Sequence, residues 1–146
     1  MPIPPTYYPG VSTQKAAAIV HVAEGEAKEL EVSITETSIP RKVFFQAIGL
    51  DGEPMPVLGI DMEDLQHPGE APGHVNIGLD GDGSGILIVS AGHAYHLHAH
   101  SDASRDTQWC SKPVTITAGT ASVRVRFVMD HEAATCDIAA IDAAAK

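Results

Sequence analysis

The chain has 146 residues, 44% of them apolar, which is enough for one ordinary domain with its own core. Nine basic and nineteen acidic side chains give a formal net charge of −10, which would repel nucleic acid and anionic membrane surfaces. No apolar run approaches the roughly 20 residues of a membrane span, and the first residues lack the basic-then-apolar layout of a signal peptide. We therefore expect no nucleic-acid partner and no membrane insertion.

Apolar residues recur mainly with a period of two, which is typical of β-strands, and helical patterns are scarce. Turn-forming pairs such as Asp51-Gly52 and Ala91-Gly92 separate the runs. The predicted strands are residues 17–22, 30–35, 42–49, 56–63, 74–80, 85–90, 94–101, 108–117 and 122–129. Short strands at this spacing predict an all-β fold, an antiparallel sandwich or barrel, and we expect a β-sandwich of about seven to nine strands.

The same alternation predicts the side chains of the core, because one face of each strand must be buried. The expected core residues are Val43, Phe45, Ile60, Ile86, Ile88, Tyr95, Leu97, Val125 and Phe127.

Both ends of the chain differ from its middle. The first ten residues hold four prolines, and such a segment cannot join a central strand. We expect it to act as an apolar arm that contacts copies or other proteins at an open strand edge. The arm residues expected to make this contact are Tyr7, Tyr8, Pro9 and Val11. The predicted units are an arm with linker strands (1–38), a β-sandwich (39–130) and a C-terminal tail (131–146).

The chain has two cysteines, Cys110 and Cys136, and neither belongs to a CxxC pair. A structural zinc knuckle therefore has no support. The two thiols could form one disulfide in an exported protein, although their spacing alone does not establish that they meet.

Three segments carry a family resemblance. VFFQAIGLDGEPMPVLGIDM contains a D-G-x-P-x-P turn, VNIGLDGDGSGILIVSAGHAYHLHAH contains a G-x-x-Y-x-L-x-A strand, and KPVTITAG precedes VRVRFVM. Together they resemble the carboxypeptidase regulatory-like domains, relatives of the Cna B-type and transthyretin-like sandwiches. The resemblance implies an Ig-like or transthyretin-like sandwich that serves as a non-catalytic structural or interaction module of an exported or cell-envelope bacterial protein.

Residues 93–100, HAYHLHAH, hold four of the eight histidines. In a strand His96, His98 and His100 share one face, and the resemblance assigns the opposite face, with Tyr95 and Leu97, to the core. We therefore expect the three imidazoles to face solvent. They form either a polar surface or a weak Zn or Cu site that folding does not require, and the surface is favoured because no carboxylate stands at a fixed offset. The acidic group Asp61, Glu63 and Asp64 beside a Gly/Pro-rich loop is expected to be a solvated rim.

The chain contains no GxSxG, HExxH, P-loop or dinucleotide-binding motif, so catalysis is not indicated. The leading interpretation is the structural or interaction module. The first alternative is a histidine-based metal-binding β-sandwich. A carbohydrate-binding module, with Tyr7, Tyr8 and Trp109 as stacking surfaces, is the second.

Overall fold

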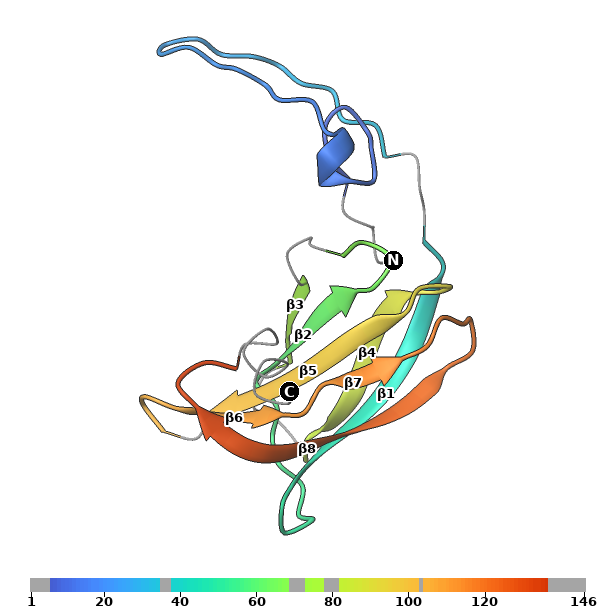
Figure 1. Cartoon of the computed structure of the whole chain (residues 1–146), viewed down its shortest axis with the longest axis vertical. Helices are drawn as coiled ribbons and strands as arrows, with labels where there is room; N and C mark the ends of the chain where they lie inside the picture. The colour runs from blue at the N-terminus through green and yellow to red at the C-terminus, as the bar shows by residue number, and fades with distance from the viewer. Residues whose placement is uncertain (1–5, 35–37, 69–72, 78–81, 103, 137–146) are drawn as a thin grey trace.

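The computed structural model describes residues 6–34, 38–68, 73–77, 82–102 and 104–136 (Figure 1). Its elements are the 3-10 helix η1 (Gln14–Ala16) and the strands β1 (Pro40–Gly49), β2 (Gly59–Asp64), β3 (Gly73–Asn76), β4 (Ser84–Ser90), β5 (Tyr95–Asp102), β6 (Gln108–Ser111), β7 (Val114–Ile116) and β8 (Val123–Ala133). Within the described ranges no helix is long and apolar enough to cross a membrane. The all-β prediction is confirmed.

The strands form one curled sheet, in the order β3-β2-β5-β6-β8-β1-β4, and β7 also pairs with β5 (Figure 1). The sheet wraps around the core as a half-barrel. Its pairs are antiparallel except β1 and β8, which run parallel from Val43 opposite Val123 to Gly49 opposite Met129. The prediction of an antiparallel arrangement throughout is therefore wrong. Strands far apart in the sequence can pair in parallel because the elements between them provide the crossover.

The strands predicted at 17–22 and 30–35 do not form within the described residues. Residues 17–22 run outward, a turn at Ala23–Glu26 is closed by the Glu26 N–H and the Ala23 carbonyl, and the chain runs back to residue 34 (Figure 1). We call residues 17–34 the extended arm. Its alternation has no surface to pack against, so the pattern does not produce a sheet.

The predicted contact residues at the start of the chain fold onto the extended arm. Tyr7 and Val11 exchange two backbone hydrogen bonds of 2.8 and 2.9 Å. The Tyr8 carbonyl accepts from the Ala18 N–H, and the Pro9 carbonyl accepts from the Ser33 N–H. This tight loop therefore holds both runs of the extended arm together at their base.

Other predicted strands differ from the observed ones mainly at their ends. The run 108–117 divides into β6 and β7 at Lys112-Pro113, since proline cannot donate a ladder hydrogen bond. Of the run 74–80, residues 78–80 lie outside the described residues, as does the tail from residue 137. β8 continues to Ala133, past the predicted sandwich boundary at residue 130.

The core agrees with the prediction on every strand except β4. Buried side chains include Val43, Phe45, Ile60, Tyr95, Leu97 and Phe127, and Val125 is partly buried. Ile86 and Ile88, by contrast, are 52% and 40% exposed, and Leu87 and Val89 are buried in their place.

The sequence GILIV is apolar at four consecutive positions, so alternation cannot decide which face of β4 is buried. Pairing with β1 decides it, because Gly85 lies opposite Phe45 and Leu87 opposite Val43. A Cβ built on Gly85 would lie 2.6 Å from the Phe45 ring, so this glycine makes room for the aromatic side chain. Leu87 and Val89 then follow on the same, inner face.

The predicted disulfide is present between Cys110 and Cys136, whose Cα atoms are 5.5 Å apart. It joins β6 to the chain beyond β8. Because Cys110 lies opposite His100 in the sheet, the bridge brings residue 136 close to the histidine-bearing strand.

Two substitutions on β4 test this register. Leu87→Ala removes a buried side chain and is expected to lower the free energy of unfolding by about 2–5 kcal/mol. Ile86→Ala, one position away, is expected to cost less than about 1 kcal/mol. Urea unfolding followed by circular dichroism measures both values. If Ile86→Ala were the more damaging change, the assigned face of β4 would be wrong.

Candidate metal centre

The pairing of β2 with β3 and β5 brings carboxylates and imidazoles into register. Asp61 lies directly opposite His98 on β5 and His74 on β3. Glu63 lies opposite His96, with its Oε2 3.6 Å from His96 Nδ1. Directly opposed residues in an antiparallel sheet share a face. The acidic residues of β2 are therefore partners of histidines rather than the predicted solvated rim.

Three side chains from three strands converge at one point of this face. Asp61 Oδ1 is 2.7 Å from His74 Nδ1, and Asp61 Oδ2 is 4.0 Å from His100 Nε2. One donor atom from each residue lies within 4.8 Å of the other two, which is a spacing that a metal ion could bridge. We call Asp61, His74 and His100 the Asp61 cluster.

Gly59 makes this convergence sterically possible. It lies opposite His100 on one side and Asn76 on the other. A Cβ at this position would lie 2.6 Å from His74 Cε1 and 2.8 Å from His100 Nε2. Because glycine has no Cβ, the two imidazole rings can stack over it, with their centroids 5.3 Å apart and an interplanar angle of 19°.

The pKa values of the two imidazoles of the cluster are shifted in opposite directions. The hydrogen bond to Asp61 and a second one to Asn76 raise the pKa of His74 above its ordinary value. Nδ1 donates to Asp61 Oδ1 and Nε2 faces Asn76 Oδ1 at 2.9 Å, so both ring nitrogens are best satisfied when protonated. Burial lowers the pKa of His100, whose neutral ring keeps a lone pair for a ligand.

His98 is fully buried, and His100 is only 8% exposed. The prediction that these imidazoles face solvent is therefore wrong for both residues, while His96 remains partly exposed. Among the described residues neither ring nitrogen of His98 has a hydrogen-bond partner. Burial lowers the pKa of His98 below its ordinary value, which favours the neutral ring. Of the three histidines predicted as ligands, only His100 belongs to a described group that could hold a metal.

A second cluster contains Asp64, His67 and His93. Asp64 Oδ2 accepts hydrogen bonds from His93 Nδ1 at 2.7 Å and His67 Nδ1 at 3.1 Å, and its Oδ1 accepts from the Gln66 N–H. Burial works to raise the pKa of Asp64, but these three hydrogen bonds outweigh it and the pKa lies below its ordinary value. Both imidazoles use the same carboxylate oxygen. The arrangement ties the loop after β2 to the start of β5.

The sequence holds one signal that points to the Asp61 cluster. Asp61 and Glu63 are two residues apart, as are His96, His98 and His100, so antiparallel pairing of the two strands would match acids with imidazoles. His74 could not be found in this way. Its contribution depends on β3, a strand of four residues whose pairing partner is not apparent from its sequence.

No protein-family model, curated protein or solved structure matches this chain.

The burial of His98 predicts a loss of stability in mild acid. Its folded pKa is lowered from 6.5, so the unfolded chain takes up the proton first. Stability is full above the unfolded pKa and falls below it as the pH decreases toward the folded pKa. Each such proton contributes a slope of up to about 1.4 kcal/mol per pH unit.

His98→Leu, which keeps the side-chain volume, should flatten this slope between pH 7 and pH 5. It should leave stability at pH 7.5 equal or higher, because unpartnered polar atoms are removed from the interior. The matched control is His21→Leu on the extended arm, where the histidine is exposed. Chemical unfolding at several pH values in the presence of a chelator gives the slopes. Equal slopes in the wild type and His98→Leu would show that His98 is not the titrating group.

Proposed function

We propose that the protein binds a divalent transition metal ion, with Zn(II) as the first candidate, through Asp61, His74 and His100. The observation that carries this proposal is the convergence of one carboxylate and two imidazoles from three separate strands over a glycine that leaves room for them. Side chains fixed by sheet pairing are held in place before an ion arrives, so little ordering is needed on binding.

The donor set suits this ion. Two imidazole nitrogens and a carboxylate oxygen are common ligands of Zn(II), and imidazole also suits Cu(II) and Ni(II). Ligand atoms around a tetrahedral Zn(II) ion lie roughly 3.3 Å apart, as follows from metal–ligand bonds of about 2.0–2.1 Å. The Asp61 carboxylate lies 2.7 Å from His74 Nδ1 through Oδ1 and 4.0 Å from His100 Nε2 through Oδ2, one distance shorter and one longer than this value. Small side-chain movements would therefore form the site, with a fourth position left for water or another ligand.

A proton competes with the metal. The hydrogen bond between His74 and Asp61 must be given up when both residues turn to the ion, and the raised pKa of His74 means that its ring holds the proton more firmly. Metal binding would therefore release a proton and weaken as the pH falls. We also expect the metal to be dispensable for folding, because the apolar core consists of side chains outside the Asp61 cluster.

A second candidate function is the structural or interaction module of an exported or cell-envelope protein. The Ig-like or transthyretin-like sandwich and the carboxypeptidase regulatory-like resemblance belong to this proposal. Its specific support is the extended arm, where Ile19 is 82% exposed and four more large apolar side chains also face solvent. The disulfide is consistent with an oxidising compartment.

The carbohydrate-binding alternative has less support. Trp109 lies on β6 and packs partly buried against the core. Tyr7 and Tyr8 belong to the loop at the base of the extended arm. These aromatic side chains come from different parts of the molecule, so sugar binding stays a prediction from sequence.

Removing single ligands tests the metal proposal. In untagged protein, His74→Ala and His100→Ala are each expected to weaken Zn(II) binding by at least about tenfold, since each removes one of three protein ligands. The matched controls are His67→Ala in the second cluster and His21→Ala on the extended arm. Isothermal titration calorimetry gives the affinity and stoichiometry, and titration in two buffers of different ionisation enthalpy reveals proton release. Loss of binding in His67→Ala alone would assign the metal to the other cluster.

A glycine substitution tests the geometry without removing a ligand. Gly59→Ala places a methyl group against both imidazoles and is expected to weaken Zn(II) binding by at least about tenfold, since misplaced donors cannot close on one ion. Gly73→Ala on β3 is the control, because its Cβ would meet only Met62 Cε, at 3.4 Å, and the Met62 carbonyl oxygen, at 3.9 Å. Unchanged affinity in Gly59→Ala would mean that the ion binds elsewhere.

A further inference from the structure

The extended arm combines exposed apolar side chains with acidic ones. Leu30, Val32 and Ile34 are all exposed, and glutamates alternate with them at Glu29 and Glu31. The whole arm contains four glutamates and one lysine, a formal net charge of 1 − 4 = −3. A group of exposed apolar side chains this close together indicates a surface that binds another molecule.

Glu29 and Glu31 have no ion-pair partner among the described residues, whereas Glu26 pairs with Lys28 at 3.7 Å. The returning run of the arm therefore presents two free carboxylates beside three apolar side chains. A partner that fits this run must be both apolar and basic.

The outer face of β4, β1 and β8 has this character. Outward-pointing side chains on these strands are apolar at Phe44, Ile86, Ile88 and Val128 and basic at Lys42, Arg124 and Arg126. We call these seven residues the basic face. Sheet register joins them, since Ile86 lies opposite Phe44 and Ile88 opposite Lys42. Arg124 lies beside Phe44 on the other side.

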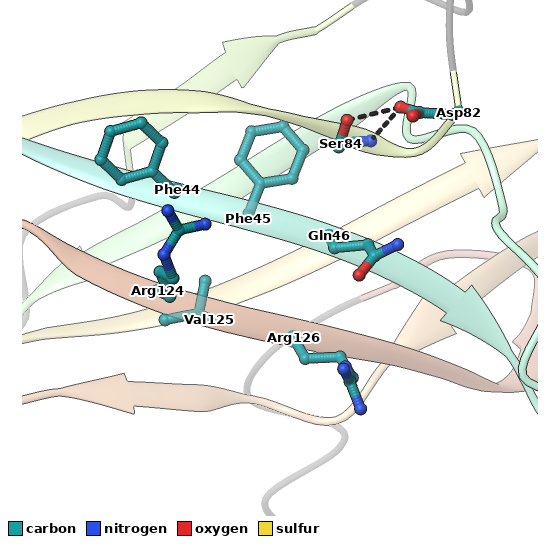
Figure 2. A pocket seen from close by; sticks show the side chains of 8 residues that line it. All are labelled: Phe44, Phe45, Gln46, Asp82, Ser84, Arg124, Val125 and Arg126. Carbon is teal, nitrogen blue, oxygen red and sulfur yellow. Dashed lines mark hydrogen bonds between the residues drawn. The ribbon is translucent and has the colours of Figure 1, made fainter.

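The basic side chains of this face lack carboxylate partners in the described part of the chain. The Arg124 guanidinium lies 5.2 Å from the centroid of the Phe44 ring, which is a cation–π contact and not an ion pair. Asp82 at the end of the face bonds to Ser84 instead (Figure 2). In a protein with a net charge of −10, three cations thus lie together on one face with no carboxylate partner among the described residues.

The basic face is also hollowed. An open groove of about 630 Å³ covers one part of it, where Phe44, Arg124 and Arg126 of the basic face line the groove together with Phe45, Gln46, Asp82, Ser84 and Val125 (Figure 2). Arg124 and Arg126 stand on β8 at the side of the groove, and Phe44 and Gln46 stand on the neighbouring strand β1 (Figure 2). Such a groove is complementary in shape and charge to an extended segment that carries apolar and acidic side chains.

We propose that the basic face of one copy binds residues 29–34 of the extended arm of a second copy. Laid edge-on over β1, the segment would direct Leu30, Val32 and Ile34 toward Phe44 and the two exposed isoleucines of β4. Glu29 and Glu31, on its opposite side, would pair with the arginines of β8. The occupant is a second copy because the arm of the same chain extends beyond the end of the sheet that carries the basic face (Figure 1). This inference rests on the interaction-module function and is independent of the metal site.

Charge exchange between the two surfaces tests the proposal. The face variant carries Arg124→Glu and Arg126→Glu, and the arm variant carries Glu29→Arg and Glu31→Arg. All four side chains are exposed, so both variants should fold with the melting temperature of the wild type. Sedimentation equilibrium is expected to show wild-type self-association that weakens as salt is added, and a dissociation constant at least about tenfold higher for each variant alone.

The equal mixture of the two variants is the decisive sample. The arm variant has a basic arm and a basic face, while the face variant has an acidic arm and an acidic face. Both contacts between unlike chains are then complementary, so the mixture is expected to associate as tightly as the wild type. Lys15→Glu with Arg105→Glu makes the same change of net charge as the face variant outside the basic face, and it should leave association unchanged.

Three results would overturn the inference. If the face variant associates normally while the arm variant does not, the arm binds another surface and the interaction-module function stands without this docking site. If the wild type stays monomeric at all concentrations and both double variants keep its melting temperature, the docking of one copy's arm on another copy is refuted. If the wild type is monomeric and the quadruple variant restores stability lost in each double variant, the occupant is the chain's own arm.

Discussion

The antiparallel pairing of β2 with β5 is the interaction on which the rest of the molecule depends. Because neighbouring residues of a strand point to opposite faces, this one pairing positions both the apolar side chains of the core and the polar side chains of the other face. Ile60 and Met62 meet Ala99 and Leu97 on the core side. Asp61, between the two apolar residues of β2, meets His98 on the other side. A shift of one residue in this register would put the carboxylate into the core and the apolar side chains among the imidazoles. Core packing therefore fixes the position of the polar cluster.

The buried face of a strand could be predicted only where apolar and polar residues alternate clearly along it. On β5 the pattern Tyr-His-Leu-His-Ala-His marks the inner face, and Tyr95, Leu97 and Ala99 are buried as expected. On β4 every position from Ile86 to Val89 is apolar, so the buried face depends on long-range pairing with β1. In the extended arm the alternation is clear, yet no sheet forms there, since a strand needs a neighbouring strand as well as a pattern.

The candidate site was predicted only in part, for a related reason. His100 belongs to a conspicuous run, but Asp61 and His74 reach it through pairings across the sheet that no local pattern specifies. His98 was expected to be exposed because it lies on the face of β5 opposite the core. This expectation is wrong, because the side chain is fully buried on that face as well. Two sides of a strand can both be covered, and the composition of the strand itself does not reveal this. Gly59 leaves room for the two imidazole rings, and this role becomes visible only when the rings are in place.

The parallel pairing of β1 with β8 has a consequence for how the chain reaches this structure. The register pairs Val43 with Val123 and Gly49 with Met129, so β1, the first strand of the sheet, cannot complete its pairing until β8, the last strand, is present. Contacts between residues this distant give the fold a high contact order, and loop-closure entropy must be overcome before they form. During synthesis β1 emerges long before β8, and until then one edge of β1 lacks its native neighbour. Folding of the sheet is therefore completed only after β8 has left the ribosome.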